Sequence, residues 1–197
     1  MKRGLVGLMV LVLVLGLAGA GLSYFTDVAV SDGNSISTGE FDIGISKDGS
    51  RYYDELRLFS FKDVAPGENH TLTFYVKNRG DYPISNISLL FNVSDKEIGK
   101  LTDSEALVDD TEYVGELSNR LVVRDFRVQM GAEELRLSNY INKTLAEINM
   151  TYITVFSGKL EPGEKLKVTI AFELSPEAGN ECQTDSVEVG IKVYARQ

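Results

Sequence analysis

Short stretches in which apolar and polar residues alternate constrain the fold of this chain more than any other feature. From Leu166 to Leu174, large apolar residues on one face alternate with Lys, Thr, Ala and Glu on the other. A period of two is that of a β-strand with one buried face. Further strands are predicted over residues 41–46, 71–76, 81–93, 120–130 and 185–195. The sequence therefore predicts an all-β fold.

Two of the predicted strands follow the same turn. The stretches 64–76 and 160–172 each contain Pro-Gly-Glu and then an alternating strand. Pro followed by Gly is typical of a tight turn between strands. After Ser138, the apolar residues Ile141, Leu145, Ile148 and Tyr152 instead have helical spacing. Many short strands with one such interruption predict a jelly-roll β-sandwich with a short helical insertion.

The N-terminus has the layout of a secretory signal. Lys2 and Arg3 precede an apolar run over residues 5–22, which ends among small residues. We predict a signal peptide over residues 1–23, with signal peptidase cutting between Ser23 and Tyr24. The alternative cut lies between Ala20 and Gly21, and sequence alone does not separate the two. The run is also just long enough to cross a bilayer, so an uncleaved anchor is the remaining alternative.

Composition limits the partners and the compartment. The formal net charge is −9, which argues against binding of nucleic acid. The single cysteine, Cys182, excludes an internal disulfide; we interpret it as a small buried hydrophobe, with an intermolecular disulfide as the alternative. In an exported chain, N-x-S/T motifs are candidate N-glycosylation sites. They occur at Asn69, Asn86, Asn92, Asn142 and Asn149.

Motifs of catalysis are absent from the sequence. The only histidine is His70, and no H-E-x-x-H motif or G-x-S-x-G elbow occurs. An acidic stretch could bind calcium through oxygen ligands but lacks regular D-x-D-x-D-G spacing, so a solvated loop is the preferred interpretation. Its acidic residues are Asp103, Glu105, Asp109, Asp110, Glu112 and Glu116. We therefore predict no catalytic residue, no metal site, no cofactor and no enzymatic activity.

Both ends of the chain outside the leader resemble one family. The N-terminal matches are Phe25, Asp27, Asn34, Ile36, Gly39, Phe41 and Asp42. The C-terminal matches are Pro162, Gly163, Glu164, Gly179, Asn180, Glu181, Gln183, Asp185, Ala195 and Gln197. These blocks resemble the TasA/camelysin family of secreted fibre-forming proteins, and are similar to archaeal bundling pili subunits. Cys182 is a departure, because relatives commonly carry an aromatic residue there.

The resemblance implies a jelly-roll subunit of an extracellular, cell-surface filament such as a pilus or biofilm-matrix fibre. Its partners would be identical subunits joined head to tail, with neighbouring filaments in bundles. The expected organisation is a donor strand and linker over residues 24–38, followed by one domain over residues 39–197 with a divergent insertion at about 95–155. Joining would occur by donor-strand complementation, in which one subunit adds a strand to the open sheet edge of the next.

The predicted donor strand has an extended, largely apolar sequence. It comprises Tyr24, Phe25, Thr26, Asp27, Val28, Ala29 and Val30. Two other functions stay open. One is a secreted metallopeptidase like camelysin, to which the same resemblance points. The other is a type IV-like pilin, cut near Gly4, whose apolar helix forms the filament core, although no early glutamate follows in the run.

Overall fold

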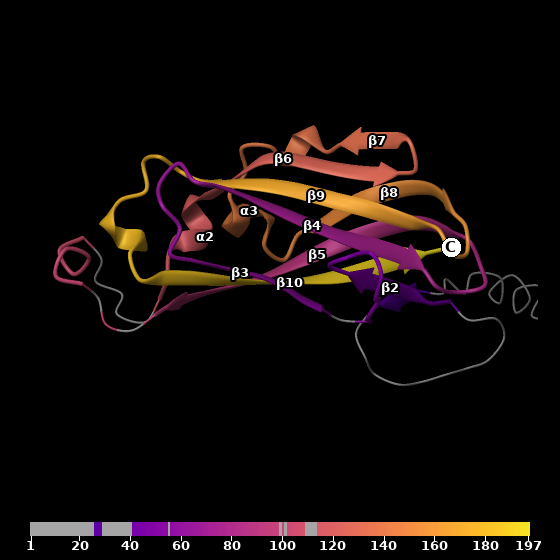
Figure 1. Ribbon diagram of the computed structural model, residues 1–197, viewed down its shortest axis with the longest axis horizontal. Helices are drawn as coiled ribbons and strands as arrows, with labels where there is room; N and C mark the ends of the chain where they lie inside the picture. The colour runs from indigo at the N-terminus through magenta and orange to yellow at the C-terminus, as the bar shows by residue number, and fades with distance from the viewer. Residues whose placement is uncertain (1–25, 29–40, 55, 99, 101, 109–113) are drawn as a thin grey trace, which may run out of the picture.

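The computed structural model describes residues 26–28 and 41–197, apart from 55, 99, 101 and 109–113. The described chain forms two antiparallel sheets (Figure 1). The first sheet contains β1 (Thr26–Val28), β3 (Leu56–Lys62), β5 (Ile84–Glu97), β8 (Tyr152–Leu160) and β10 (Asp185–Arg196). The second contains β2 (Ile43–Ser46), β4 (Asn69–Asn78), β6 (Leu121–Met130), β7 (Glu133–Arg136) and β9 (Lys165–Leu174). The predicted all-β fold is confirmed; the jelly-roll connectivity stays a prediction.

The core lies between the two sheets and comes from the alternating strands. In β9 every second residue from Leu166 to Leu174 is buried, as the sequence pattern predicts. Phe91 of β5 meets Phe126 of β6 edge to face, with ring centroids 6.4 Å apart. Burial of each such side chain stabilises the fold by about 1.5–3 kcal/mol. The four fully buried phenylalanines are Phe74, Phe91, Phe126 and Phe172.

The two Pro-Gly-Glu turns have the same structure. Gly67 and Gly163 have φ of 80° and 85°, a conformation that favours glycine. In each turn the Glu backbone N–H donates to a carbonyl three residues earlier, over 2.9 Å at Glu68 and 3.0 Å at Glu164. The strands that follow, β4 and β9, pair with each other along most of their length.

The predicted short helical insertion after Ser138 is present, but its helical elements are shorter than the apolar spacing up to Tyr152 suggests. A 3₁₀ turn, η1 (Ser138–Tyr140), precedes the one-turn helix α3 (Leu145–Ile148). Thr144 and Glu147 form a capping box at the start of α3. Tyr152 begins β8 instead of continuing the helix, because Ile153 and Val155 alternate into the core. Strands β3, β7 and β8 were not predicted.

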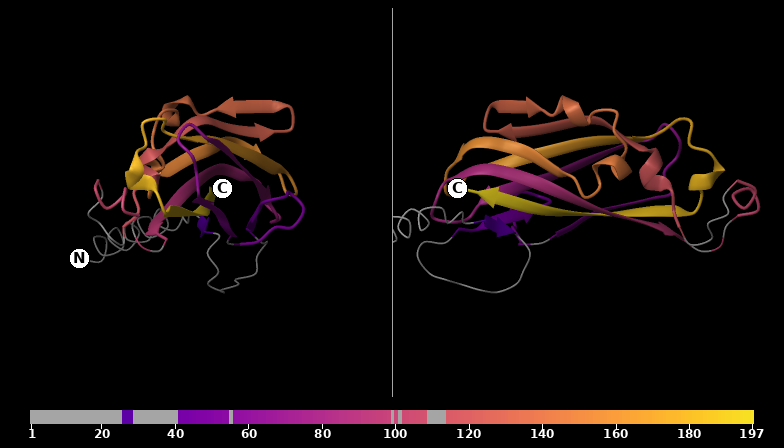
Figure 2. Two further views of the ribbon diagram at one scale, coloured as in Figure 1. Left: turned by 60° about the vertical axis from the view of Figure 1, so that its left-hand side comes forward. Right: turned by 180° about the vertical axis from the view of Figure 1, so that it is seen from behind.

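The molecule is elongated, and β10 runs along most of its length (Figures 1 and 2). The C-terminus lies at one end. The other end carries the connection 98–116, the helix α2 (Leu117–Arg120) and the 3₁₀ turn η2 (Asn180–Cys182). Cys182 is partly buried and packs against the core. Within the described residues, no helix is long and apolar enough to cross a membrane.

Candidate functional site

The outer edge of β10 is shared between two strands. On one side, β5 pairs with β10 over its whole length, Asp185 to Arg196. On the other side, β3 pairs only with residues from Ser186 to Ile191. The rest of that edge faces β1, in the register Thr26 with Arg196, Asp27 with Ala195 and Val28 with Tyr194. The N-terminal segment thus lies on the part of β10 that β3 leaves open.

Three residues of the predicted donor strand, Thr26 to Val28, are therefore in a strand. The other four, Tyr24, Phe25, Ala29 and Val30, lie outside the described residues, as do both predicted cleavage positions (Ala20/Gly21 and Ser23/Tyr24).

The β10 segment that receives β1 is firmly built into the first sheet. Val193 and Ala195 are buried in the core. Tyr194 packs edge-on against Tyr152 of β8, with ring centroids 5.0 Å apart. The Ser85 hydroxyl donates to the Arg196 carbonyl over 3.1 Å. These contacts hold the receiving edge in place independently of β1.

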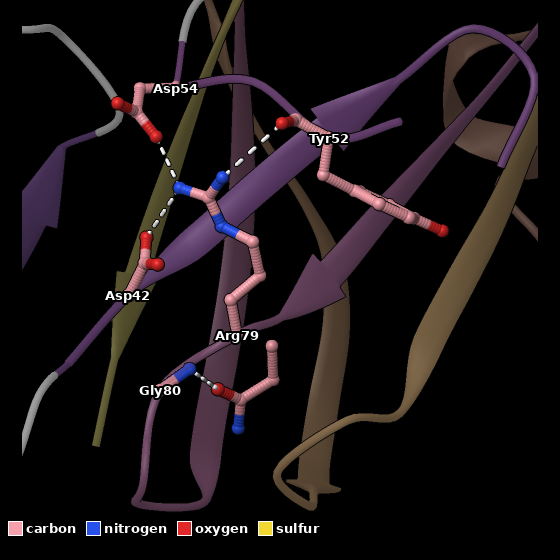
Figure 3. A network of polar contacts seen from close by, with 6 residues as sticks. Asp42, Tyr52, Asp54, Arg79 and Gly80 are labelled. Carbon is pink, nitrogen blue, oxygen red and sulfur yellow. Dashed lines mark hydrogen bonds and ion pairs between the residues drawn. The ribbon is translucent and has the colours of Figure 1, made fainter. Parts of the chain in front are cut away.

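A polar network fixes the point where the chain enters the second sheet (Figure 3). The Arg79 guanidinium pairs through Nη2 with Asp42, at 2.7 Å, and with Asp54, and it donates through Nη1 to the Tyr52 carbonyl at 3.3 Å. The backbone N–H groups of Arg79 and Gly80 both donate to the Asp42 carbonyl. Burial alone would lower the pKa of Arg79, but the two carboxylates outweigh it and raise the pKa.

Gly44 belongs to the same network. A Cβ at this position would lie 2.8 Å from Nε of Arg79 and 2.9 Å from Cβ of Tyr52. Only glycine therefore allows Arg79 to lie across β2. The network anchors Asp42 to the end of β4, so the segment N-terminal to Asp42 starts from a fixed position.

The predicted glycosylation positions differ in exposure. Asn69, Asn92 and Asn142 are exposed, whereas Asn86 and Asn149 are partly buried. The Asn86 side chain donates to Ser157, and the Asn149 side-chain oxygen accepts from the Val93 N–H. Neither Asn142 nor Asn149 lies within α3, which spans Leu145–Ile148. Glycan occupancy stays a prediction.

Three carboxylates meet at the end of the molecule that carries the connection 98–116. Glu97 ends β5, Asp185 begins β10, and Glu105 comes from a turn in that connection. Each offers a carboxylate oxygen, and the three oxygens lie within 4.8 Å of one another. Glu105 is fully buried and Asp185 is 3% exposed. The prediction of a solvated loop is therefore wrong for Glu105.

Sequence reasoning missed this cluster because its members are far apart in the chain. Glu97 and Asp185 become neighbours only through the register of β5 and β10, where they lie directly opposite each other. The nearest signal was the acidic stretch itself, which contains Glu105. A set of carboxylate oxygens suits hard divalent cations such as Ca²⁺ or Mg²⁺.

The only histidine lies outside this cluster. His70 is in β4, where its Nε2 is 3.3 Å from a Glu68 oxygen and its ring meets Phe61 edge to face at 5.6 Å. Among the described residues, the one group of three or more potential metal ligands consists of Glu97, Glu105 and Asp185. Those three residues would hold a divalent metal ion if one binds.

Comparison with known proteins identifies the family. The model of the family described as camelysin metallo-endopeptidase matches residues 1–197. No curated protein matches the chain. The family resemblance seen in the sequence is confirmed, since TasA-type proteins belong to this family. The prediction that the chain is not an enzyme is contradicted, because the matching family is described as a metallo-endopeptidase.

Proposed function

The chain belongs to the camelysin metallo-endopeptidase family, and on that basis we propose that this member polymerises head to tail into an extracellular filament by donor-strand complementation. Members of the family are secreted or cell-surface proteins, which agrees with an extracellular location. The observation that carries the proposal is that β1 occupies the part of the β10 edge that β3 leaves open. In the single chain, the chain's own N-terminal strand pairs with this part of the edge. In the filament, the same strand of a neighbouring subunit would pair there instead.

The length of the open edge matches the predicted donor strand. β1 ends opposite Tyr194 and β3 begins opposite Ile191, which leaves Lys192 and Val193 without a described partner strand on that side. Continuation of the same register in a donated strand places Ala29 opposite Val193 and Val30 opposite Lys192. A donated strand that continues to Val30 would therefore complete the edge up to β3.

The pairing within one chain is weak enough to be exchanged. Three residue pairs join β1 to β10. Roughly three backbone hydrogen bonds contribute about 1 kcal/mol each, while ordering three residues costs about 1–2 kcal/mol each. The net free energy of the intramolecular contact is thus near zero. The same strand of a neighbouring subunit can therefore replace it at this edge.

The anchored linker gives the assembly its direction. The Arg79 network holds Asp42 at the end of β4, so the donated strand always leaves the subunit from the same place. Donor and acceptor are different surfaces of one chain, and such a contact repeats without closing on itself. An open fibre is the expected product.

A cysteine pair distinguishes donation from self-pairing. Thr26→Cys and Arg196→Cys lie opposite each other in the register, and opposite residues of antiparallel strands are at a distance that a disulfide spans. The pair is made in a Cys182→Ser background and oxidised after assembly. We expect a ladder of covalent multimers on a non-reducing gel, whereas cross-linking within single chains only would contradict the proposal.

Two controls complete this experiment. The pair Thr26→Cys with Lys167→Cys places the second thiol on β9 of the other sheet, so it should give no ladder. Deletion of residues 24–33 should leave a folded monomer that forms no fibres under the electron microscope. Fibres in the deletion variant would show that the N-terminal strand is not the joining element.

A second candidate function is peptide-bond hydrolysis, which the description of the family favours. Glu97, Glu105 and Asp185 are the residues that would hold the metal ion; a bound metal ion in a metallopeptidase acts as a Lewis acid and activates water. Digestion of casein that stops on addition of a chelator and fails in Glu105→Gln would support this function. Equal digestion by the wild type and Glu105→Gln would place the chemistry elsewhere.

A further inference from the structure

We propose that Glu97, Glu105 and Asp185 form a binding site for a hard divalent cation, with Ca²⁺ preferred, which ties the connection 98–116 to the β5–β10 strand pair. The site lies at the end of the sandwich away from the C-terminus and from β1 (Figure 1). It is independent of the filament contact, and nothing in the proposed assembly requires it.

The carboxylates of this site have too few hydrogen-bond donors. Glu105 accepts from the Thr102 N–H at 3.2 Å and the Thr184 hydroxyl at 3.0 Å, both through Oε2. Asp185 accepts the Glu116 N–H through Oδ2 at 2.6 Å, and Glu97 accepts the Thr184 hydroxyl through Oε1. Among the described residues, no partner reaches Glu97 Oε2, Glu105 Oε1 or Asp185 Oδ1, although all three atoms are buried.

Positive charge is also missing from the site. Within the described ranges, no Lys, Arg or His forms an ion pair with any of the three carboxylates. Like charges directly opposite on paired strands are destabilising, and Glu97 and Asp185 are such a pair. Two buried carboxylates beside a partly buried one, without a counter-charge, are unfavourable. A bound divalent cation removes most of this penalty.

The backbone holds the site open. Thr184, directly before β10, has φ of 58°, which is unfavourable for a β-branched residue. This conformation places its hydroxyl between Glu97 and Glu105, but the hydroxyl has one hydrogen and can donate to only one of them at a time. Backbone strain of this kind is concentrated at functional sites.

Gly115 lies close to the carboxylate of Asp185. A Cβ on Gly115 would lie 2.8 Å from Asp185 Oδ1 and 3.0 Å from the Lys96 carbonyl. Glycine is therefore needed where the chain passes beside the β5–β10 strand pair at this carboxylate.

The spacing of the oxygens allows Ca²⁺, and the coordination chemistry of the two ions favours it over Mg²⁺. Ca²⁺ binds oxygens at about 2.4 Å, so two of its ligands are at most about 4.8 Å apart, and the three oxygens lie within that separation. Mg²⁺ requires shorter bonds of about 2.1 Å and near-octahedral geometry, a stricter demand than the flexible six- to eight-oxygen shell of Ca²⁺. Water would complete the shell of either ion.

A proton is the competing occupant. Burial, and then the nearby charges of Glu97 and Glu116, raise the pKa of Asp185 to about 7, against the stabilising hydrogen bond from the Glu116 N–H. Without a cation, the raised pKa of Asp185 favours its protonated form more than in an ordinary aspartate. Measurements at pH 8 reduce this competition.

The test is a thermal-unfolding titration of the purified full chain at pH 8, after removal of metals with EDTA. At a Ca²⁺ concentration 100 times the dissociation constant, the melting temperature should rise by about 5–10 °C. Mg²⁺ should give a smaller rise at the same concentration. No rise with Ca²⁺, or a rise with Zn²⁺ alone, would overturn the proposal.

Substitutions distinguish cation binding at this site from general binding of cations to the acidic surface. Glu105→Gln and Asp185→Asn keep the side-chain shape and should abolish the Ca²⁺-dependent rise. Glu177→Gln removes one exposed charge away from the cluster and should keep it. If one cluster variant does not fold, isothermal titration of the other decides. Retention of one Ca²⁺ per chain in a folded cluster variant would contradict the assignment.

Discussion

The Arg79 network offers the sharpest test of what positions the N-terminal segment. In Arg79→Gln, the guanidinium is lost while Asp42 stays three-quarters buried, with 25% of its side chain exposed. The hydrogen bond from a charged group to Asp42 contributes about 1.5–2 kcal/mol at this burial. The more exposed pair with Asp54 contributes about 0–1 kcal/mol, and the long bond to the Tyr52 carbonyl about 0.5 kcal/mol.

The substitution should therefore reduce the free energy of unfolding by about 2–3 kcal/mol. Urea denaturation of the folded chain measures this quantity directly. The matched control is Lys159→Gln, which breaks a surface ion pair to Glu161 with 69% of the lysine side chain exposed. It should change the free energy by no more than about 0.5 kcal/mol.

A double-mutant cycle isolates the main contact. Arg79→Gln and Asp42→Asn, alone and together, should give a coupling free energy of about 1–2 kcal/mol. If Arg79→Gln lowers the stability no more than Lys159→Gln does, the network does not anchor the chain at Asp42. In that case the fixed starting point of the donated strand would have to come from elsewhere.

Three further predictions concern other parts of the molecule. Burial, and then the charges of Glu181 and Asp185, raise the pKa of Cys182 to about 12. At pH 8, iodoacetamide should therefore alkylate Cys182 about 10³-fold more slowly in the folded than in the unfolded chain. Equal rates would refute the burial of this thiol. Gly163→Ala should destabilise by about 1 kcal/mol through φ alone, since a Cβ there meets nothing within 4 Å; an unchanged urea midpoint would contradict this. Mass spectrometry of protein from a glycosylating host should find glycans first on the exposed Asn69, Asn92 and Asn142, and five bare sites would exclude glycosylation.

The sequence determined the strands whose burial alternates. In β4, β9 and β10 the side-chain period of two survives intact, because one face of each strand meets the core and the other meets water or a long polar side chain. The turns before β4 and β9 could equally be predicted from the sequence, since Gly after Pro supports only a narrow set of backbone conformations. The same residues carried the family resemblance.

Other elements depended on their surroundings. Tyr152 fits a helix by spacing, yet it begins β8 because pairing with β5 satisfies the backbone and buries Ile153 and Val155. Local propensity is a weak preference that such long-range pairing overrides. β7 has no buried residue and forms only against β6, so no hydrophobic pattern marks it.

The sequence by itself thus determined the all-β class, the family and the segment proposed to be donated. Only the tertiary structure decided that this segment lies on the part of β10 that β3 leaves open, and that Glu97, Glu105 and Asp185 share one buried site. The physical reason is the same in both cases. Alternation and turn chemistry act between neighbours in the chain, whereas an open sheet edge and a cluster of carboxylates are products of strand register between residues far apart in sequence.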